Sequence, residues 1–300
     1  MDVLPQHARL MRLATVAALA VALCLVLAKA IAWWLSGSVS LLAGLTDSLL
    51  DSAASLLNLL AVGAVPALAQ WQVFAEKLPK PGTWATYRME TTKAGQPTTS
   101  ATLRFSVQPG REVDGQPHVW FTVEPVMWLG SRERAPLSLL VRPDMDRAAA
   151  SRLIENSAEI IFSNPVKGAY HMTREDIAWI TDWAKLTYTS ELTPDSPAKE
   201  TIEAGGRARS CERLRMLATT VTDPPMVSKQ VLTFKGTVWR DATVPFGVAR
   251  AEWQEETVKD TETKRDVKTL TLIDSGWEAP SADPLDRGRT FSVWRLIFNR

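Results

Sequence analysis

The sequence predicts a transmembrane α-helical hairpin at the N-terminus, followed by an α+β domain with a curved antiparallel sheet and helices on one side. Three observations lead to this fold class. Residues 13–75 carry only three charged side chains, Lys29, Asp47 and Asp51, whereas charges are spread through the rest of the chain. From residue 83 onward apolar and polar residues alternate, as they do in strands with one buried face. Two stretches with helical spacing interrupt that alternation.

Two apolar runs make up the predicted hairpin, which is assigned to residues 1–65. The first run, 13–35, is long enough as a helix to cross a hydrocarbon core of roughly 30 Å. Trp33 and Trp34 end it, where amphipathic rings favour the membrane interface. A short Ser-Gly-Ser turn leads directly into the second run, 39–65. So short a turn between two spans predicts antiparallel helices in the bilayer.

The second run carries two carboxylates. Asp47, Asp51 and Ser55 follow i, i+4 spacing and therefore share one helix face. A carboxylate in a bilayer costs several kcal/mol unless it is paired, neutralised or facing a wet cavity. Two carboxylates on one face repel each other, and a bridging divalent cation would remove that repulsion. We predict that Asp47 and Asp51 are metal ligands; the alternative is an amphipathic helix that lies in the membrane interface with a polar Asp/Ser face.

A motif in the same segment links it to a known family. A Gly-Ser-x-Ser turn at 37–40 precedes an Asp-x-x-x-Asp pair at 47–51 in a Ser-rich stretch. Residues 9–62 thereby resemble the first two transmembrane helices of cation diffusion facilitators, the zinc and ferrous-iron efflux family of bacteria. The resemblance implies a tetrahedral transport site for Zn²⁺ or Fe²⁺, in which Asp47 and Asp51 supply two oxygen ligands.

The other half of that site is missing from the sequence. After residue 68 no apolar run approaches the length of a membrane span. The three histidines, His7, His118 and His171, lie where none could complete the ligand set. Metal would be bound only where self-association, or the helices of other transporters, supplied the remaining ligands. The sequence therefore predicts a fusion protein that contains a fragment of a transporter.

A junction at residues 66–82 joins the two parts. Residues 67–69, Ala-Leu-Ala before Gln, match the small-x-small pattern of a signal-peptide cleavage site, unless that pattern is chance in an Ala/Leu-rich stretch. Arg9 and Arg12 place the N-terminus in the cytoplasm, so two spans would return the next domain to the cytoplasm, whereas a single span would export it. We expect a protein of the bacterial inner (plasma) membrane; the side of its soluble domain stays open, with the periplasm slightly favoured.

The soluble domain is assigned to residues 83–300. Strands are expected at 83–91, 99–107, 118–126, 137–141, 210–219, 230–239, 248–253 and 267–275. A helix is expected at 146–162, and a second helix is expected to begin after Thr173, with Asp176 as its capping partner, and to reach about residue 186. Turns are expected at 93–97 and 205–206, with a solvated hairpin tip within 255–266.

Large aromatic rings gather in this domain. They predict either a Trp-rich core or an apolar cavity under the curved sheet that holds an acyl chain or another lipid-like ligand. The rings concerned are Trp120, Trp128, Trp179, Trp183, Trp239, Trp253 and Trp277. Cys211 in an expected strand and the Trp-x-x-x-x-Val-Pro-x-Gly pattern at 239–247 make residues 75–300 similar, faintly, to exported proteins of the lipoprotein-carrier superfamily. That resemblance implies a fold with such a cavity.

Composition limits the remaining functions. A net charge of +1 with evenly mixed signs argues against nucleic acid as a partner, which needs a basic stripe. No nucleophile elbow, phosphate-binding Gly loop or metalloprotease pair is present, so we do not expect an enzyme. Cys211 is expected to be packed rather than reactive. Three hypotheses stay open: a metal-transport protein with a half site, a membrane-anchored or exported lipid-binding or scaffold domain, and a fusion without a selected function.

Overall fold

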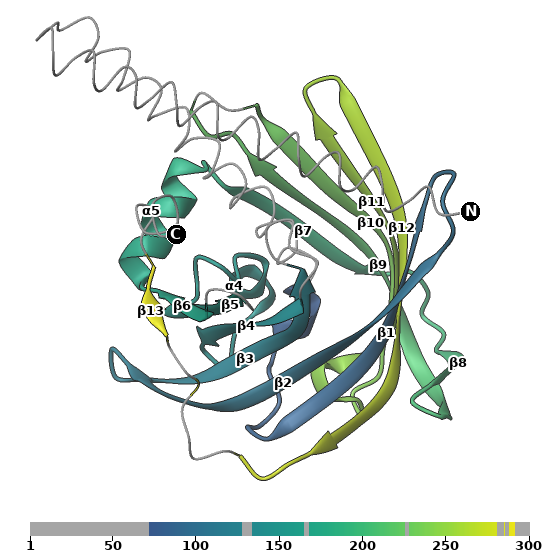
Figure 1. Ribbon diagram of the computed structural model, residues 1–300. Coiled ribbons are helices and arrows are strands. Elements are labelled where there is room, and N and C mark those ends of the chain that lie inside the picture. The colour runs from purple at the N-terminus through teal and green to yellow at the C-terminus, as the bar shows by residue number, and fades with distance from the viewer. Residues whose placement is uncertain are drawn as a thin grey trace, which may run out of the picture. The chain divides into compact units, whose positions relative to one another are not determined.

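A computed structural model describes residues 72–127, 134–164, 168–225, 228–280, 285 and 288–291 (Figure 1). The hairpin predicted for 1–65, and with it Asp47 and Asp51, lies outside these residues. Among the described helices, none is long and apolar enough to cross a membrane. The account below therefore concerns the part of the chain that begins at residue 72.

Strands dominate this part of the chain. In chain order they are β1 Thr83–Lys93, β2 Thr99–Val113, β3 Gln116–Met127, β4 Arg134–Val141, β5 Glu159–Asn164, β6 Gly168–Met172, β7 Thr187–Pro194, β8 Glu200–Ala204, β9 Arg207–Thr222, β10 Gln230–Arg240, β11 Val248–Lys259, β12 Glu262–Trp277 and β13 Arg289–Thr290. The helices are short: α3 Gln72–Ala75, α4 Arg147–Ser151, α5 Arg174–Trp183 and the single 3-10 turn η1 Pro245–Gly247.

The thirteen described strands belong to one sheet, in which β13 pairs parallel to β6 and the long strands form two antiparallel meanders. Strands β1 to β6 follow one another in sequence order, and so do β9 to β12, with β7 and β8 both paired to β9. The meanders join where β1 pairs with β12, from Thr83 opposite Trp277 to Lys93 opposite Asp266. The centre of the sheet is thus made by the first and the last long strand.

The sheet is so strongly curved that its two edges, near β6 and at β7, approach each other (Figure 1). Strand β6 lies near one end of the strand order and β7 at the other, yet the chain passes from one to the other through α5 alone. A helix of this length spans about 15 Å. α5 therefore bridges the opening between the ends of the curved sheet.

The predicted fold class was wrong. The described chain is one large curved β-sheet with a few short helices, not a helical hairpin followed by an α+β domain with helices on one side. The helix expected at 146–162 shows the cause. Only α4 forms there, with the Asp146 side chain accepting from the Ala149 N–H, and β5 follows it. Ile160 and Ile161 of β5 are both buried, because both faces of this strand are covered, and such a run lacks the alternation of an exposed strand.

Other local predictions are confirmed. The eight expected strands correspond to β1–β4 and β9–β12, and the turn at 205–206 joins β8 to β9 with both glycines at positive φ. Thr173 and Asp176 form the capping box that begins α5. The expected hairpin tip is the tight β11–β12 connection, where Asp260 has a φ of 52°.

An aromatic cluster fills one face of the sheet. Phe105 is fully buried, with Phe74 of α3 stacked at a centroid distance of 4.5 Å and Tyr87 edge-on at 5.4 Å. Phe121 and Phe246 each lie 6.0 Å from it. On the opposite face of β3–β5 a smaller cluster contains Trp120, Leu140, Ala158 and Ile161.

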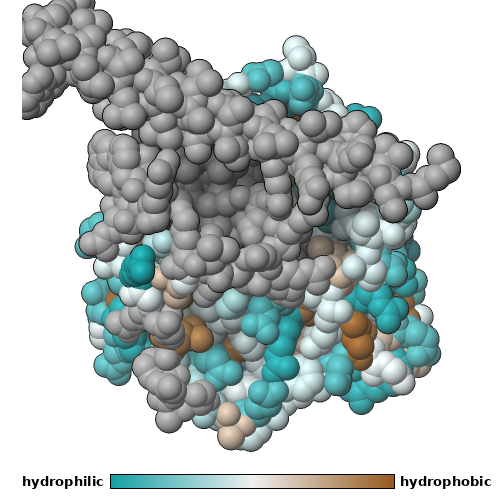
Figure 2. Space-filling model, in the orientation of Figure 1, coloured by the Kyte–Doolittle hydropathy of each residue, from teal (hydrophilic) through white to brown (hydrophobic). Residues whose placement is uncertain are grey.

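The tryptophans divide between core and surface. Trp120, Trp239 and Trp253 are buried as predicted, whereas Trp179 and Trp277 are about half exposed. On the face seen in Figure 2, the apolar side chains of the described residues form small separate spots among hydrophilic ones. The two exposed tryptophans therefore need an explanation other than core packing.

Candidate functional site

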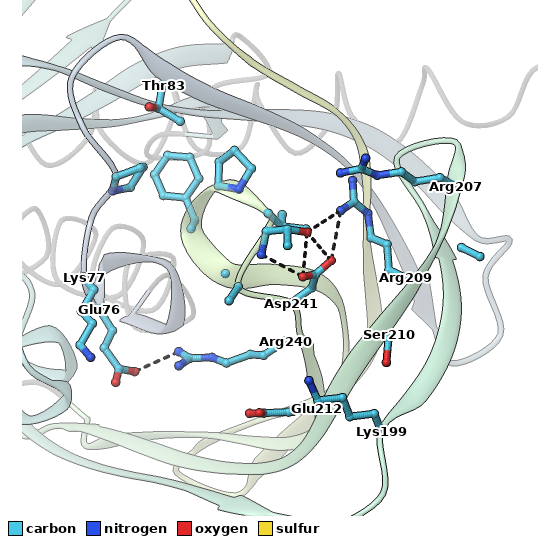
Figure 3. Close-up of a pocket in the computed structure, with 18 of the residues that line it drawn as sticks. Glu76, Lys77, Thr83, Lys199, Arg207, Arg209, Ser210, Glu212, Arg240 and Asp241 are labelled. Atoms are coloured by element: carbon cyan, nitrogen blue, oxygen red, sulfur yellow. Dashed lines mark hydrogen bonds and ion pairs between the residues drawn. The ribbon is translucent and has the colours of Figure 1, made fainter.

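A cleft of about 1140 Å³ lies where three segments meet, beside the starts of β1 and β9 and the end of β10 (Figure 3). The segment between α3 and β1 forms one wall, with Glu76, Lys77, Lys80 and Thr83. Lys199 and the first residues of β9 form a second wall, and the β10–β11 connection, residues 240–247, forms the third. These segments are distant in sequence and come together only through the pairing of β1, β12, β11, β10 and β9.

The lining of the cleft is rich in positive charge. Six cationic side chains and three carboxylates face it; the cations are Lys77, Lys80, Lys199, Arg207, Arg209 and Arg240, and the acids are Glu76, Glu212 and Asp241. Arg209 pairs with Asp241 and Arg240 with Glu76. The other four cations form no ion pair with any residue that the structure describes. Lys77 lies on the side of Glu76 in Figure 3, and Lys199 and Arg207 lie on the other side.

Arg209 belongs to the framework of the cleft. Its side chain is only 5% exposed, and it contacts Asp241 Oδ2 at 3.1 Å and donates to the Ala204 carbonyl at 2.8 Å. Thr243 donates to Asp241 through its backbone N–H and its hydroxyl. Burial raises the pKa of Asp241, but these hydrogen bonds and the Arg209 charge outweigh it and hold the pKa below its ordinary value. Asp241 is therefore ionised, and this network fixes the β10–β11 turn on β9.

A second framework contact centres on Glu76. Its carboxylate lies 2.9 Å from Arg240 Nη2 and 3.5 Å from Arg147 Nη2. Arg147 also donates to the Leu192 carbonyl of β7 at 2.8 Å. Burial raises the pKa of Glu76, yet the two guanidinium groups outweigh it, so the pKa lies below the ordinary value of 4.5. This charge cluster, the Glu76 clamp, connects α3, α4, β7 and β10.

The floor of the cleft is apolar. Val244, Pro245 and Phe246 line it, and Phe246 adopts a φ of 62°, which is unusual for a side chain with a Cβ. Its ring lies against Phe105 and Phe121 of the aromatic cluster. Tyr87 donates to the Val248 carbonyl at 2.9 Å and so holds the end of this turn. One strained residue therefore separates the cleft from the core.

The sequence motifs only partly anticipate this site. Residues 239–247 do form a tight turn, and that turn is a wall of the cleft. Cys211 is fully buried in β9, and burial raises the pKa of its thiol, as expected for a packed cysteine. The four unpaired cations were missed, because the overall charge is balanced and they come from segments far apart in sequence.

The predicted metal ligands Asp47 and Asp51 lie outside the described residues. Within the described part of the chain, no group of three His, Cys, Asp or Glu side chains is arranged to hold a metal ion. The metal site at Asp47 and Asp51 therefore stays a prediction. The same holds for the expectations that the chain is not an enzyme, binds no nucleic acid and resides at the inner membrane.

Comparisons with known proteins find two separate similarities, although no family model matches the chain. The chain is similar to the cation-efflux pump FieF of Pectobacterium carotovorum subsp. carotovorum, with 64% identity over 58 residues, which is 19% of each chain. The FieF proteins of Serratia proteamaculans and Yersinia pestis match at 60% and 55% identity over the same length. The match spans about a fifth of the length of these relatives.

Among solved structures, the similarity extends over most of the chain but is weak. The hypothetical lipoprotein YmcC of Escherichia coli shares 14% identity, with 71% of this chain and 90% of that chain covered and a TM-score of 0.26. The LolA superfamily protein NE2245 of Nitrosomonas europaea shares 8% identity, with 72% and 94% covered and a TM-score of 0.25. The comparisons thus find both resemblances that the sequence indicated, the one to cation-efflux proteins and the one to lipoprotein-carrier-like proteins. TM-scores this low support no argument about function.

Proposed function

We propose that the domain built on the curved sheet binds an anionic, lipid-like ligand and holds its acidic group in the basic cleft. The observation that carries the proposal is the excess of positive charge in one cavity: Lys77, Lys80, Lys199 and Arg207 form no ion pair among the described residues, against one carboxylate of the lining, Glu212, that is likewise unpaired there. Like charges around one cavity repel one another. An anion bound between them would relieve that repulsion, so the free cleft favours an acidic ligand.

Two further features favour an amphiphile over a small inorganic anion. Val244, Pro245 and Phe246 give the cleft an apolar floor next to its cations. Its volume of about 1140 Å³ is slightly above the roughly 300–1,000 Å³ typical of small-molecule pockets. A headgroup would therefore leave room for the first part of an alkyl chain against the floor.

The test is ligand affinity in a charge-neutralised variant. Lys199→Gln combined with Arg207→Gln is expected to weaken the binding of hexyl phosphate about tenfold, because each exposed charge contributes up to about 1 kcal/mol. Affinity is measured by calorimetric titration of the full chain held in phosphatidylcholine nanodiscs. Hexyl phosphate should also bind more tightly than inorganic phosphate, since its alkyl chain can contact Phe246.

The matched control neutralises two exposed cations outside the cleft, Lys93→Gln with Lys264→Gln, and should leave the affinity unchanged. Hexanol tests whether the apolar floor alone suffices for binding. Equal affinity of hexyl phosphate for the cleft variant and for this control would contradict the proposal, and so would equal binding of hexanol and hexyl phosphate.

A second candidate function concerns the N-terminal segment. Its 64% identity with a cation-efflux pump over 58 residues favours binding of a divalent cation such as Zn²⁺ or Fe²⁺ by Asp47 and Asp51. Uptake of radiolabelled zinc or iron into vesicles should be small, because the chain supplies only half of a four-ligand site. Any flux should be lost in the Asp47→Ala/Asp51→Ala double variant; equal flux in the two proteins excludes a role for these carboxylates.

A further inference from the structure

An exposed tryptophan lies beside two residues that line the basic cleft, Thr83 and Lys80. Trp277 ends β12 with 54% of its surface exposed, as much as Val267 and more than any other large apolar side chain of the described residues. It lies opposite Thr83, which lines the cleft. Lys80, another residue of the cleft wall, places its Nζ 5.7 Å from the centre of the indole ring. The ring and the cleft cations therefore belong to one continuous surface.

The ring is held in its exposed position by the fold. Its Nε1–H donates to the Pro81 carbonyl at 3.0 Å. At Gly82 an added Cβ would lie 2.6 Å from Trp277 Nε1, so the absence of a side chain there lets the indole rest on the backbone. Because its only polar hydrogen is satisfied by the protein, the outward part of the ring offers an apolar surface alone.

One positive charge, that of Lys80, lies beside the ring, and three further cations without ion pairs line the same cleft. Lys77, Lys80, Lys199 and Arg207 are exposed around the cleft. The neighbouring carboxylate of Glu278 is neutralised by Arg104 at 2.5 Å. Indole rings favour the interface of a bilayer, and exposed lysines and arginines are attracted to anionic headgroups. A tryptophan fixed beside unpaired cations matches that interface in both respects.

We propose that Trp277, Lys80 beside it and the other cleft cations dock this domain on the surface of an anionic lipid bilayer, with the cleft facing the headgroups. This proposal deepens the proposed function, since it names the surface from which the cleft would take its anionic ligand. The indole enters the headgroup layer, and Lys80 beside it contacts lipid phosphates. This docking is a contact with the membrane surface, and none of the described residues has to cross the bilayer for it.

The experiment compares two tryptophan variants of the full chain held in phosphatidylcholine nanodiscs. Flotation measures how much protein is captured by vesicles of phosphatidylcholine with phosphatidylglycerol or of phosphatidylcholine alone. Capture by the anionic vesicles is expected to be about tenfold higher, since each cation near an anionic surface contributes severalfold. Trp277→Gln, whose amide can still donate to Pro81, should reduce this capture about fivefold to tenfold, because apolar ring surface no longer leaves water.

The matched control is Trp179→Gln on α5, where the ring is 49% exposed but distant from the cleft in sequence and not part of its lining. The anionic vesicles should capture this control variant as strongly as the unmodified chain. Affinity for hexyl phosphate in Trp277→Gln should be unchanged, so loss of docking is separable from loss of the ligand site. Equal capture by the two kinds of vesicle, or equal losses in the two tryptophan variants, overturns the proposal.

Discussion

A Phe105→Ala substitution is expected to lower the free energy of unfolding by about 4 kcal/mol, within the range for aromatic-to-alanine changes in a core. Phe105 is fully buried and touches rings from α3, β1, β3 and the β10–β11 turn. The cavity left by its ring cannot collapse easily, because its neighbours are held by different elements. Urea unfolding followed by tryptophan fluorescence measures the change.

The matched variant is Phe105→Leu, which keeps an apolar side chain of intermediate volume and is expected to cost about 1.5 kcal/mol. The expected order of the two losses in unfolding free energy, larger for Phe105→Ala than for Phe105→Leu, is a stricter test than either value alone. If both shifted the urea midpoint equally, or if neither shifted it, the aromatic cluster would not be the core of the domain.

The second large effect concerns the Glu76 clamp. Glu76→Gln keeps the shape of the side chain but leaves Arg147 and Arg240 without their carboxylate, and we expect a loss of about 2 kcal/mol near neutral pH. That figure is reduced from the roughly 3–5 kcal/mol of fully buried pairs because both arginines retain contact with water. The measurement is again the free energy of unfolding in urea.

The pH dependence of this loss follows from the direction of the pKa shift. Because the pKa of Glu76 lies below its ordinary value of 4.5 in the folded protein, the carboxylate stabilises the fold above that pH. This contribution is lost as the pH falls through the lowered pKa, so the difference between Glu76→Gln and the unmodified chain should vanish in acid. As a control, Glu278→Gln removes an exposed partner of Arg104 and should change stability by under about 1 kcal/mol at any pH.

Local chemistry in the sequence was a good guide to single elements. Thr173 and Asp176 identified the start of α5, and Gly205-Gly206 identified the turn between β8 and β9, because capping and positive-φ turns depend on neighbouring residues alone. The strand β5 was predicted as helix because Ala158 and Ile161 continue a helical spacing of apolar residues, and the burial of β5 on both faces left no alternation that would indicate a strand. Which faces are covered depends on residues elsewhere in the chain.

The basic cleft could not be predicted for a related reason. Lys77 and Lys80 precede β1, whereas Lys199 and Arg207 flank β8. They become neighbours through the successive pairing of β1, β12, β11, β10 and β9, which must be known first. For Trp277 the sequence offered either a place in the core or one in the wall of an apolar cavity, since nothing local shows that β12 ends in an exposed ring beside the cleft.

The join between β1 and β12 also has a consequence for the making of the protein. Strand β1 leaves the ribosome long before its partner, because residues 94–277 must be translated before β12 is complete. At about 5–20 residues per second this takes roughly 10–40 s. During that interval the first meander presents an unpaired strand edge, which other nascent chains can pair with wrongly. The order of translation, more than the finished fold, sets the period in which this chain is most prone to aggregate.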